Sequence, residues 1–341
     1  MTSHAKLIGR LAAAVAVIGL AIPATASADN QVSLRLGNST GPTHVQTLRD
    51  IMFADIVEKK TNGDVKIQVF SSDQLGKQLQ QVEGTMSGSQ DFWGGTAGFM
   101  GNYQDDWRVL SVYYLFNSRD HIVAFTKSDL FEEMNKRAVA KMGLRLLNLT
   151  SVRTPNTFIS KKPMMTMQDI KGLKVRIPDV AGNARSLKAL GATPTPINFA
   201  DSYLAFSQGV VDAIPVSLDG IRSAKFTDIG KYVLITEHNW EPTGIYMNEK
   251  SYQKLSPAQQ KIAFDAAIEA SDFYWKKYME SEVGIRQLIK QRGGVLIETD
   301  PTPWREHIVN NLVPELDKEK FWTIPELYQK IQAFDPALKK T

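Results

Sequence analysis

The chain has 341 residues and a formal net charge of +4, a balance that excludes a nucleic-acid-binding protein with a strongly basic surface. It contains no cysteine, which excludes disulfides and thiolate sites, so its stability must come from an ordinary hydrophobic core. Its length exceeds the size at which one core usually stops growing, and this favours two domains.

The first 28 residues have the pattern of a secretory signal peptide. Lys6 and Arg10 precede an uncharged run over residues 11–22, and small residues lead to Ala28. The run is too short for a membrane anchor, which needs about 20 apolar residues. We expect cleavage after Ala28 and a mature chain that begins at Asp29 in the periplasm. Loss of the two basic residues lowers the net charge from +4 to +2.

Strand and helix patterns alternate at the start of the mature chain. Residues 31–36 and 65–70 alternate in polarity as half-buried strands do, and residues 37–42 form a break after the first strand. Helices are predicted after residue 42 and over residues 78–87. The first should bury one face, made of Leu48, Met52, Ile56 and Val57. This alternation predicts a parallel α/β sheet.

The pattern restarts in the second half of the chain. Strands are predicted at residues 144–149, 173–177 and 193–197, with a helix at 183–190. Ser256 and Pro257 then form a helix start, and the helix should continue to about residue 291. We interpret this long helix as a spine across two α/β lobes.

Arg176 is the strongest candidate binding residue. It ends a predicted strand shortly before Pro178, and ligands of open α/β sheets bind outside the carboxyl ends of the strands. Its guanidinium group offers a planar fork that pairs with a carboxylate and stays charged. The alternative from the spacing alone is a surface arginine in a salt bridge.

The same segment resembles a known family. Residues 169–178, 191–196 and 199–206, together with 71–76, are similar to the binding proteins of tripartite ATP-independent periplasmic (TRAP) transporters, of the C4-dicarboxylate-binding type. The resemblance covers nearly the whole mature chain. It implies that Arg176 clamps a ligand carboxylate.

The resemblance also implies an architecture and a partner. The fold would be a two-lobed periplasmic-binding-protein-like α/β fold, in which each lobe is a mixed, mostly parallel sheet flanked by helices. Lobe 1 would comprise residues 29–152 and about 242–281, and lobe 2 would comprise 153–241 and about 282–320. Residues 321–341 would form a C-terminal tail. The protein would be a monomer without a cofactor that delivers its ligand to TRAP membrane permease subunits.

At two other ligand-contacting positions of the family, this chain offers alternative residues. Many members have a ligand-contacting asparagine where this chain has Val216, although Ser217 can supply a weaker contact. This departure argues against assuming a C4-dicarboxylate or sialic acid. A second family arginine maps to Asn156 by counting, whereas a small loop shift gives the role to Arg153. The other role for Arg153 is an ion pair at the lobe edge.

Glycines and aromatic residues supply further candidates. The glycine-rich stretch at residues 93–98 lacks the Gly-Lys-Ser/Thr ending of a phosphate-binding loop. The resemblance instead places it at the cleft, with Trp93 and Thr96 facing the ligand. Phe199 and Trp240 are candidate walls of the same cavity, although large aromatic residues more often belong to the core.

The sequence contains no pattern of a catalytic centre. The five histidines lack the close spacings of a zinc site, and no G-x-S-x-G motif is present, so we predict no metal and no enzyme. His44 is a candidate polar contact from the first lobe, and the alternative is a solvated loop histidine. Asn38, in the loop at residues 37–42, is a further candidate contact.

These observations predict a receptor that closes on a small organic acid. Val216 cannot hydrogen-bond a second carboxylate, which favours a monocarboxylate, and the polar candidates favour a hydroxylated or sugar acid. An aromatic acid or a C4-dicarboxylate is the alternative ligand. An exported hydrolase and a sensory receptor without transport are alternative functions. Closure would occur about a hinge near Ser151 and Trp240.

Overall fold

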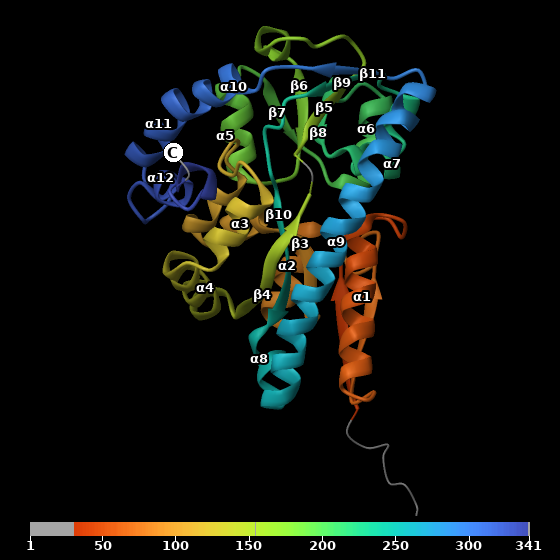
Figure 1. The fold of residues 1–341 in the computed structure, drawn as a ribbon, viewed down its shortest axis with the longest axis vertical. Helices are drawn as coiled ribbons and strands as arrows, with labels where there is room; N and C mark the ends of the chain where they lie inside the picture. Colours follow the sequence, from red (N-terminus) through yellow and green to blue (C-terminus); the bar gives the residue numbers. More distant parts are fainter. Residues whose placement is uncertain (1–30, 154, 340–341) are drawn as a thin grey trace, which may run out of the picture.

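A computed structural model describes residues 31–153 and 155–339. The predicted signal peptide, residues 1–28, lies outside the described residues. The chain forms two lobes, each built on one β-sheet, and the long helix α9 (Pro257–Gln291) runs from the first lobe to the second (Figure 1).

The first lobe contains a five-stranded sheet in the order β2-β1-β3-β10-β4. Strand β1 is parallel to its neighbours β2 and β3, and β10 runs antiparallel to both of its neighbours. The strands are β1 (Val32–Gly37), β2 (Val65–Phe70), β3 (Phe92–Thr96), β4 (Leu144–Val152) and β10 (Pro242–Asn248). The helices of this part are α1 (Val45–Lys60), α2 (Gln78–Ser87), α3 (Arg119–Thr126), α4 (Asp129–Met142) and α8 (Glu249–Gln253).

The second lobe contains a six-stranded sheet in the order β11-β9-β5-β8-β6-β7. Strand β5 is antiparallel to both neighbours, whereas β6 is parallel to β7 and β8. The strands are β5 (Thr157–Ser160), β6 (Lys174–Ile177), β7 (Thr193–Pro196), β8 (Ala213–Val216), β9 (Tyr232–Ile235) and β11 (Val295–Glu298). The helices are α5 (Ala181–Ala189), α6 (Ser202–Ser207) and α7 (Leu218–Ser223).

Helix α1 buries most of the predicted face, but not Leu48. Leu48 is 38% exposed, while Phe53 is fully buried and Ile56 and Val57 pack in the core. The first half of the helix instead buries polar side chains, among them Gln46, Thr47, Arg49 and Asp50. The apolar pattern is wrong at Leu48 because it does not show that the polar side chains of this half of α1 are the buried ones.

Helix α9 starts as the sequence predicts. The Ser256 side chain accepts from the Gln259 backbone N–H, and the Gln259 side-chain oxygen accepts from the Ser256 backbone N–H. The two bonds form a capping box. At about 1.5 Å per residue its 35 residues extend roughly 50 Å. Small alanines bury its first half in the first lobe, and Ile285 and Ile289 bury its second half in the second lobe. One helix thereby contacts both cores.

The C-terminal residues form helices, the last of which returns to the first lobe (Figure 1). They are α10 (Thr302–His307), α11 (Val313–Lys318) and α12 (Leu327–Gln332). The Tyr328 hydroxyl donates to the Tyr113 carbonyl at 3.3 Å, and Gln332 Nε2 donates to the Tyr114 carbonyl at 3.1 Å. The segment predicted as a tail is therefore packed against residues of the first lobe.

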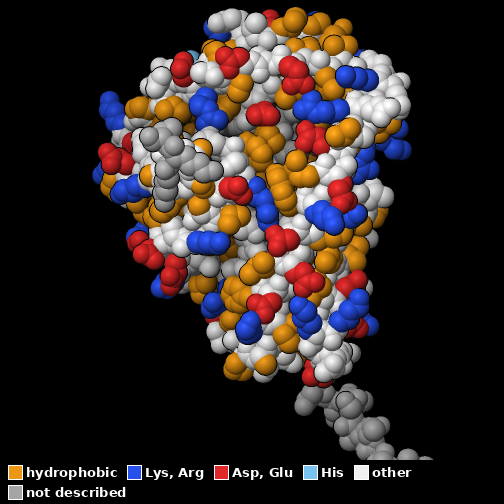
Figure 2. Space-filling model, in the orientation of Figure 1, with side chains coloured by type: hydrophobic (Ala, Val, Ile, Leu, Met, Phe, Trp, Pro, Cys, Tyr) orange, Lys and Arg blue, Asp and Glu red, His pale blue; other side chains and the backbone are white. Residues whose placement is uncertain are grey.

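The surface carries mixed charges. On the face shown in Figure 2, basic and acidic side chains are interspersed over both lobes, as the nearly balanced composition requires. Within the described residues, no helix is both long and apolar enough to cross a membrane. In the same part of the chain, no group of three or more His, Asp or Glu side chains is arranged to hold a metal ion.

Candidate ligand-binding site

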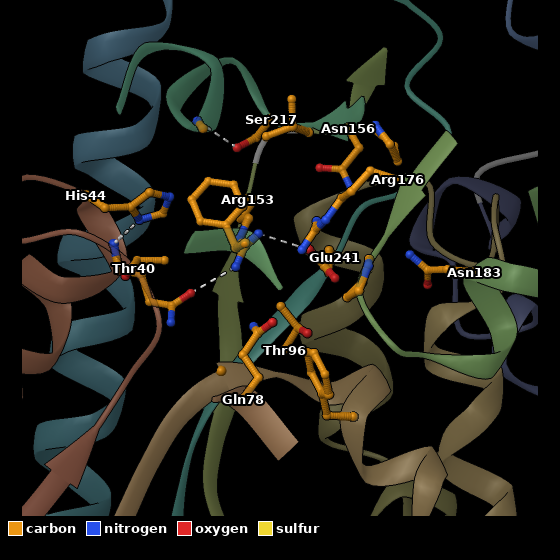
Figure 3. A pocket seen from close by; sticks show the side chains of 18 residues that line it. Thr40, His44, Gln78, Thr96, Arg153, Asn156, Arg176, Asn183, Ser217 and Glu241 are labelled. Carbon is orange, nitrogen blue, oxygen red and sulfur yellow. Dashed lines mark hydrogen bonds and ion pairs between the residues drawn. The ribbon is translucent and has the colours of Figure 1, made fainter. Parts of the chain in front are cut away.

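A polar cavity lies between the two lobes. It is partly open to solvent, and residues of both lobes line it. Thr40, Gln78 and Thr96 line it from the first lobe, and Figure 3 shows Asn156, Arg176 and Ser217 on the opposite side. Thr96, Arg176 and Ser217 lie at or directly after the carboxyl ends of strands, which is where ligands bind in α/β sheets.

Arg176 is a buried cation that faces the cavity from β6. Its side chain is held by one bond from Nε to the Ile197 carbonyl at 2.8 Å, and its guanidinium carbon lies 5.8 Å from the Phe199 ring centre. Within the described residues, no carboxylate lies at ion-pair distance from it. Burial lowers the pKa of Arg176 to about 10, and nearby Glu241 partly offsets this effect. The group is therefore charged at neutral pH and lacks an anion.

Arg153 is the second cation of the cavity, and it already has an anionic partner. Its Nη1 lies 3.2 Å from Glu241 Oε2, and its Nη2 donates to Gln46 Oε1 at 2.9 Å. Burial opposes the charge, but Glu241 together with Tyr274 and Tyr278 outweighs burial and holds the pKa of Arg153 above its ordinary value. Arg153 directly follows strand β4 of the first lobe, and its side chain reaches Gln46 of helix α1.

His44 is buried at the start of α1. Its Nδ1 accepts from the Gln46 backbone N–H at 3.0 Å, so it caps the helix, and its Nε2 lies 3.5 Å from Asp219 Oδ2 of α7. Burial lowers the pKa of His44 to about 4, although Asp219 acts in the opposite direction. His44 is neutral at neutral pH, and it is 1% exposed, so it is not a solvated loop residue.

Several polar atoms of the cavity wall have no hydrogen-bond partner among residues 31–153 and 155–339. They are Thr96 Oγ1, Asn156 Oδ1, Asn183 Oδ1 and Gln78 Oε1, and all four are buried. Unpaired buried polar groups are costly, because each loses its bonds to water without replacement. The cavity therefore presents acceptors that a ligand with hydroxyl groups can satisfy.

Most of the predicted site residues come together on this wall. Arg176, Arg153, Asn156, Phe199, Val216, Ser217, Thr96 and His44 all line the cavity. Val216 adds an apolar surface at the end of β8. Ser217 contributes less than its position suggests, because its Oγ accepts from the Gly220 backbone N–H and from the Tyr278 hydroxyl.

Three predicted residues lie elsewhere. Trp93 is 1% exposed in the core, 5.0 Å from the Tyr246 ring, because its side chain points from β3 away from the cavity. Trp240 packs 6.3 Å from Trp275 of α9. Asn38 lies behind Thr40, where its Nδ2 donates to Asp50 Oδ2 at 2.8 Å. Of the three, Asn38 is bonded to a lining residue, since its Oδ1 accepts from the Thr40 backbone N–H at 3.1 Å.

The adjacent glycines of β3 serve close packing. A Cβ at Gly94 would lie 2.5 Å from Asp50 Oδ2, and one at Gly95 would lie 2.0 Å from the Trp93 ring. Gly95 also lines the cavity. The stretch is a strand and not an anion-binding loop, and its glycines allow buried side chains to approach the backbone.

Other lining residues were not singled out from the sequence. Gln46, Gln78, Asn183 and Glu241 come from separate elements, and Figure 3 shows the last three converging on the cavity. The sequence pattern places Asn183 only at the start of a predicted helix. The one usable signal was Glu241, an acidic residue directly before strand β10 at a lobe crossover.

Two lobes that enclose a buried polar cavity, joined by crossovers and a shared helix, define a solute-binding protein. The model of the bacterial extracellular solute-binding proteins, family 7, matches residues 36–319, and the chain belongs to this family. The resemblance seen in the sequence is therefore confirmed.

Individual relatives agree with this assignment. The 2,3-diketo-L-gulonate-binding periplasmic protein YiaO of Escherichia coli is 28% identical over 288 residues, covering 84% of this chain and 87% of the relative. A TRAP solute-binding protein from Polaromonas sp. JS666, solved with D-erythronate, has a TM-score of 0.81 and 25% identity over 89% of this chain and 99% of that chain. A Fusobacterium protein solved with sn-glycerol 3-phosphate has a TM-score of 0.84 and 22% identity over 91% and 98%.

The protein is thus an extracytoplasmic solute-binding protein of the TRAP type, and it is not an enzyme. The two-lobed α/β fold with a long shared helix is confirmed by the same structures.

Proposed function

We propose that the ligand is a hydroxylated monocarboxylate of the sugar-acid type, held between the lobes with its carboxylate on Arg176. The observation that carries this proposal is a buried, unpaired guanidinium group in a cavity that also contains unpaired hydrogen-bond acceptors. A planar guanidinium pairs bidentately with a carboxylate. Hydroxyl groups on the rest of the ligand would donate to Thr96, Asn156, Asn183 and Gln78.

The relatives support this class. YiaO binds 2,3-diketo-L-gulonate and the Polaromonas protein was solved with D-erythronate, and both are polyhydroxy monocarboxylates or their keto forms. Val216 supports the same choice, because its side chain cannot pair with a second carboxylate. An aromatic acid would leave the acceptors of the wall unpaired.

The remaining features of the proposal concern export and movement. The chain would be exported by its first 28 residues, act as a monomer, and use the lobe boundaries given above. Closure would occur near Ser151 and Trp240. Both sit against α9, since Ser151 Oγ bonds to Ser271 Oγ at 2.7 Å and Trp240 packs near Trp275.

Competitive titration tests the ligand class. The mature protein would be titrated with an aldonate or uronate, a benzoate-type acid and succinate, after a thermal-shift screen of a carboxylate library. A ligand at 100 times its Kd should add about 2.7 kcal/mol of stability. We expect the sugar acid to bind tightest. Tightest binding of succinate would contradict the role given to Val216, and tightest binding of benzoate would contradict the role of the hydroxyl groups.

A further inference from the structure

Glu241 is an acidic residue on the wall of a cavity that binds an acid. It lies in the crossover between β9 and β10, is 8% exposed, and pairs with Arg153 at 3.2 Å (Figure 3). A carboxylate here disfavours any anionic ligand, so its presence needs a reason beyond ligand attraction.

The charges of the wall give that reason. Arg153, Arg176 and Glu241 are the ionised side chains that line the cavity, and they leave one net positive charge. His44 adds none, because burial lowers its pKa to about 4. Since Glu241 is already paired with Arg153, the net charge resides on Arg176. One ligand carboxylate therefore makes the closed cavity neutral.

A second negative charge on the ligand would have no counterpart. It would lie in the same small cavity as the Glu241 carboxylate, where burial weakens screening by water and strengthens repulsion between like charges. Without Glu241, Arg153 would be free to balance that second charge.

The fold itself does not make this selection. The Fusobacterium protein, which shares the fold, was solved with a phosphate monoester, and the Polaromonas protein was solved with a monocarboxylate. A phosphate monoester carries close to two negative charges at neutral pH. The choice between one and two charges must therefore depend on individual residues of the cavity.

We propose that Glu241 is a specificity-determining residue that restricts this protein to singly charged acids by occupying Arg153. The proposal rests on the proposed function, since it assumes that Arg176 holds a ligand carboxylate. It assigns to Arg153 the role of a latent second anion site, which Glu241 keeps closed.

The test compares matched acids that differ by one carboxylate. The probes are D-gluconate, D-galactonate and D-erythronate, each paired with the aldarate of the same carbon skeleton, and affinities are measured by calorimetry. We expect the wild-type protein to prefer the best aldonate over its aldarate by about tenfold or more. In Glu241→Gln, which keeps a hydrogen-bond acceptor for Arg153, this preference should fall by about tenfold or more.

Two further variants separate charge from structure. Glu241→Asp retains the charge and should retain the preference. Glu306→Gln removes the same charge from an exposed position on α10 and should leave every affinity unchanged. Circular dichroism and thermal unfolding would establish that each variant is folded.

The outcomes are distinct. An equal loss of affinity for both acids of a pair in Glu241→Gln would show that Glu241 only positions Arg153, and would overturn the inference. A wild-type preference for the aldarate would overturn it as well. If the wild-type protein binds no carboxylate at all, the proposed function fails together with this inference.

Discussion

His44 Nε2 of α1 lies 3.5 Å from Asp219 Oδ2 of α7, and this contact joins the first lobe to the second inside the molecule. Asp219 is also bound by Arg222, whose Nε donates to Oδ1 at 3.1 Å. The imidazole is neutral because burial lowers its pKa to about 4. Opening of the lobes would expose His44 to water.

The first prediction is that ligand affinity falls in acid. In the closed state the pKa of His44 is about 4, and in an open state it should return toward 6.5, so protonation favours opening. The closed state keeps its full stability above pH 6.5 and loses it as the pH falls toward 4. Binding should be about tenfold weaker at pH 5.5 than at pH 7.5.

Calorimetry at the two pH values would measure this effect, with His44→Gln as the control. The charged groups that act on His44 are Asp219, Arg153, Arg222 and Arg49, and they are the same in the variant. The variant should therefore show little change between the two pH values. An equal loss in both proteins would assign the pH dependence to another group.

The second prediction concerns Arg176. Arg176→Lys keeps a positive charge but loses the planar fork, and Arg176→Ala loses both. We expect each to weaken binding by about tenfold or more, with alanine the weaker binder. Calorimetry with the best ligand measures this, and thermal unfolding of the free proteins checks that both variants fold. Unchanged affinity in both would remove Arg176 from the site.

The third prediction is that the ligand makes the protein more compact. Because groups from both lobes line the cavity, a ligand that contacts both should bind the closed state more tightly than the open state. Small-angle scattering should show a smaller radius of gyration at saturation. The Arg176→Ala variant under the same ligand concentration serves as the control. An unchanged radius for the wild-type protein at saturation would argue against closure.

The fourth prediction uses two glycines in opposite environments. Gly94→Ala would push a Cβ to 2.5 Å from Asp50 Oδ2 and should lower the free energy of unfolding by about 1–3 kcal/mol. Gly284 lies in α9 with open space around its Cα, so Gly284→Ala should raise this free energy by about 0.5–1 kcal/mol. Urea denaturation compares the two.

Gly284→Ala also tests whether helix α9 bends when the lobes close. If α9 must bend for closure, a more stable helix at this position would weaken ligand binding while it strengthens folding. If α9 moves as a straight rod, affinity would be unchanged. Loss of folding stability in Gly284→Ala would contradict the reading of its environment.

The sequence predicted the elements better than the site. Periodic strands and the Ser256 cap are local signals, and they identified α9 with its observed bounds, Pro257–Gln291. Arg176 could be found because strand ends in α/β sheets lie at binding sites. The predicted face of α1 was wrong at Leu48, because hydrophobic spacing does not show that the polar half of a helix is the buried one.

The rest of the site depends on contacts between distant segments. Glu241 becomes part of the cavity only because β10 returns from the second lobe to the first, and Asn183 only because α5 faces the first lobe. Trp93 has the same sequence signal as a cavity wall, but strand alternation turns its side chain toward the core. Such choices require the pairing of strands, which local patterns do not contain.

The position of β10 has a consequence for the order in which the protein folds. This strand lies between β3 and β4, yet it follows the whole of β5–β9 in the chain. Residues 31–152 alone would therefore carry two exposed strand edges at the middle of their sheet. The first lobe must wait for residue 248 to emerge, and such distant pairing is slow.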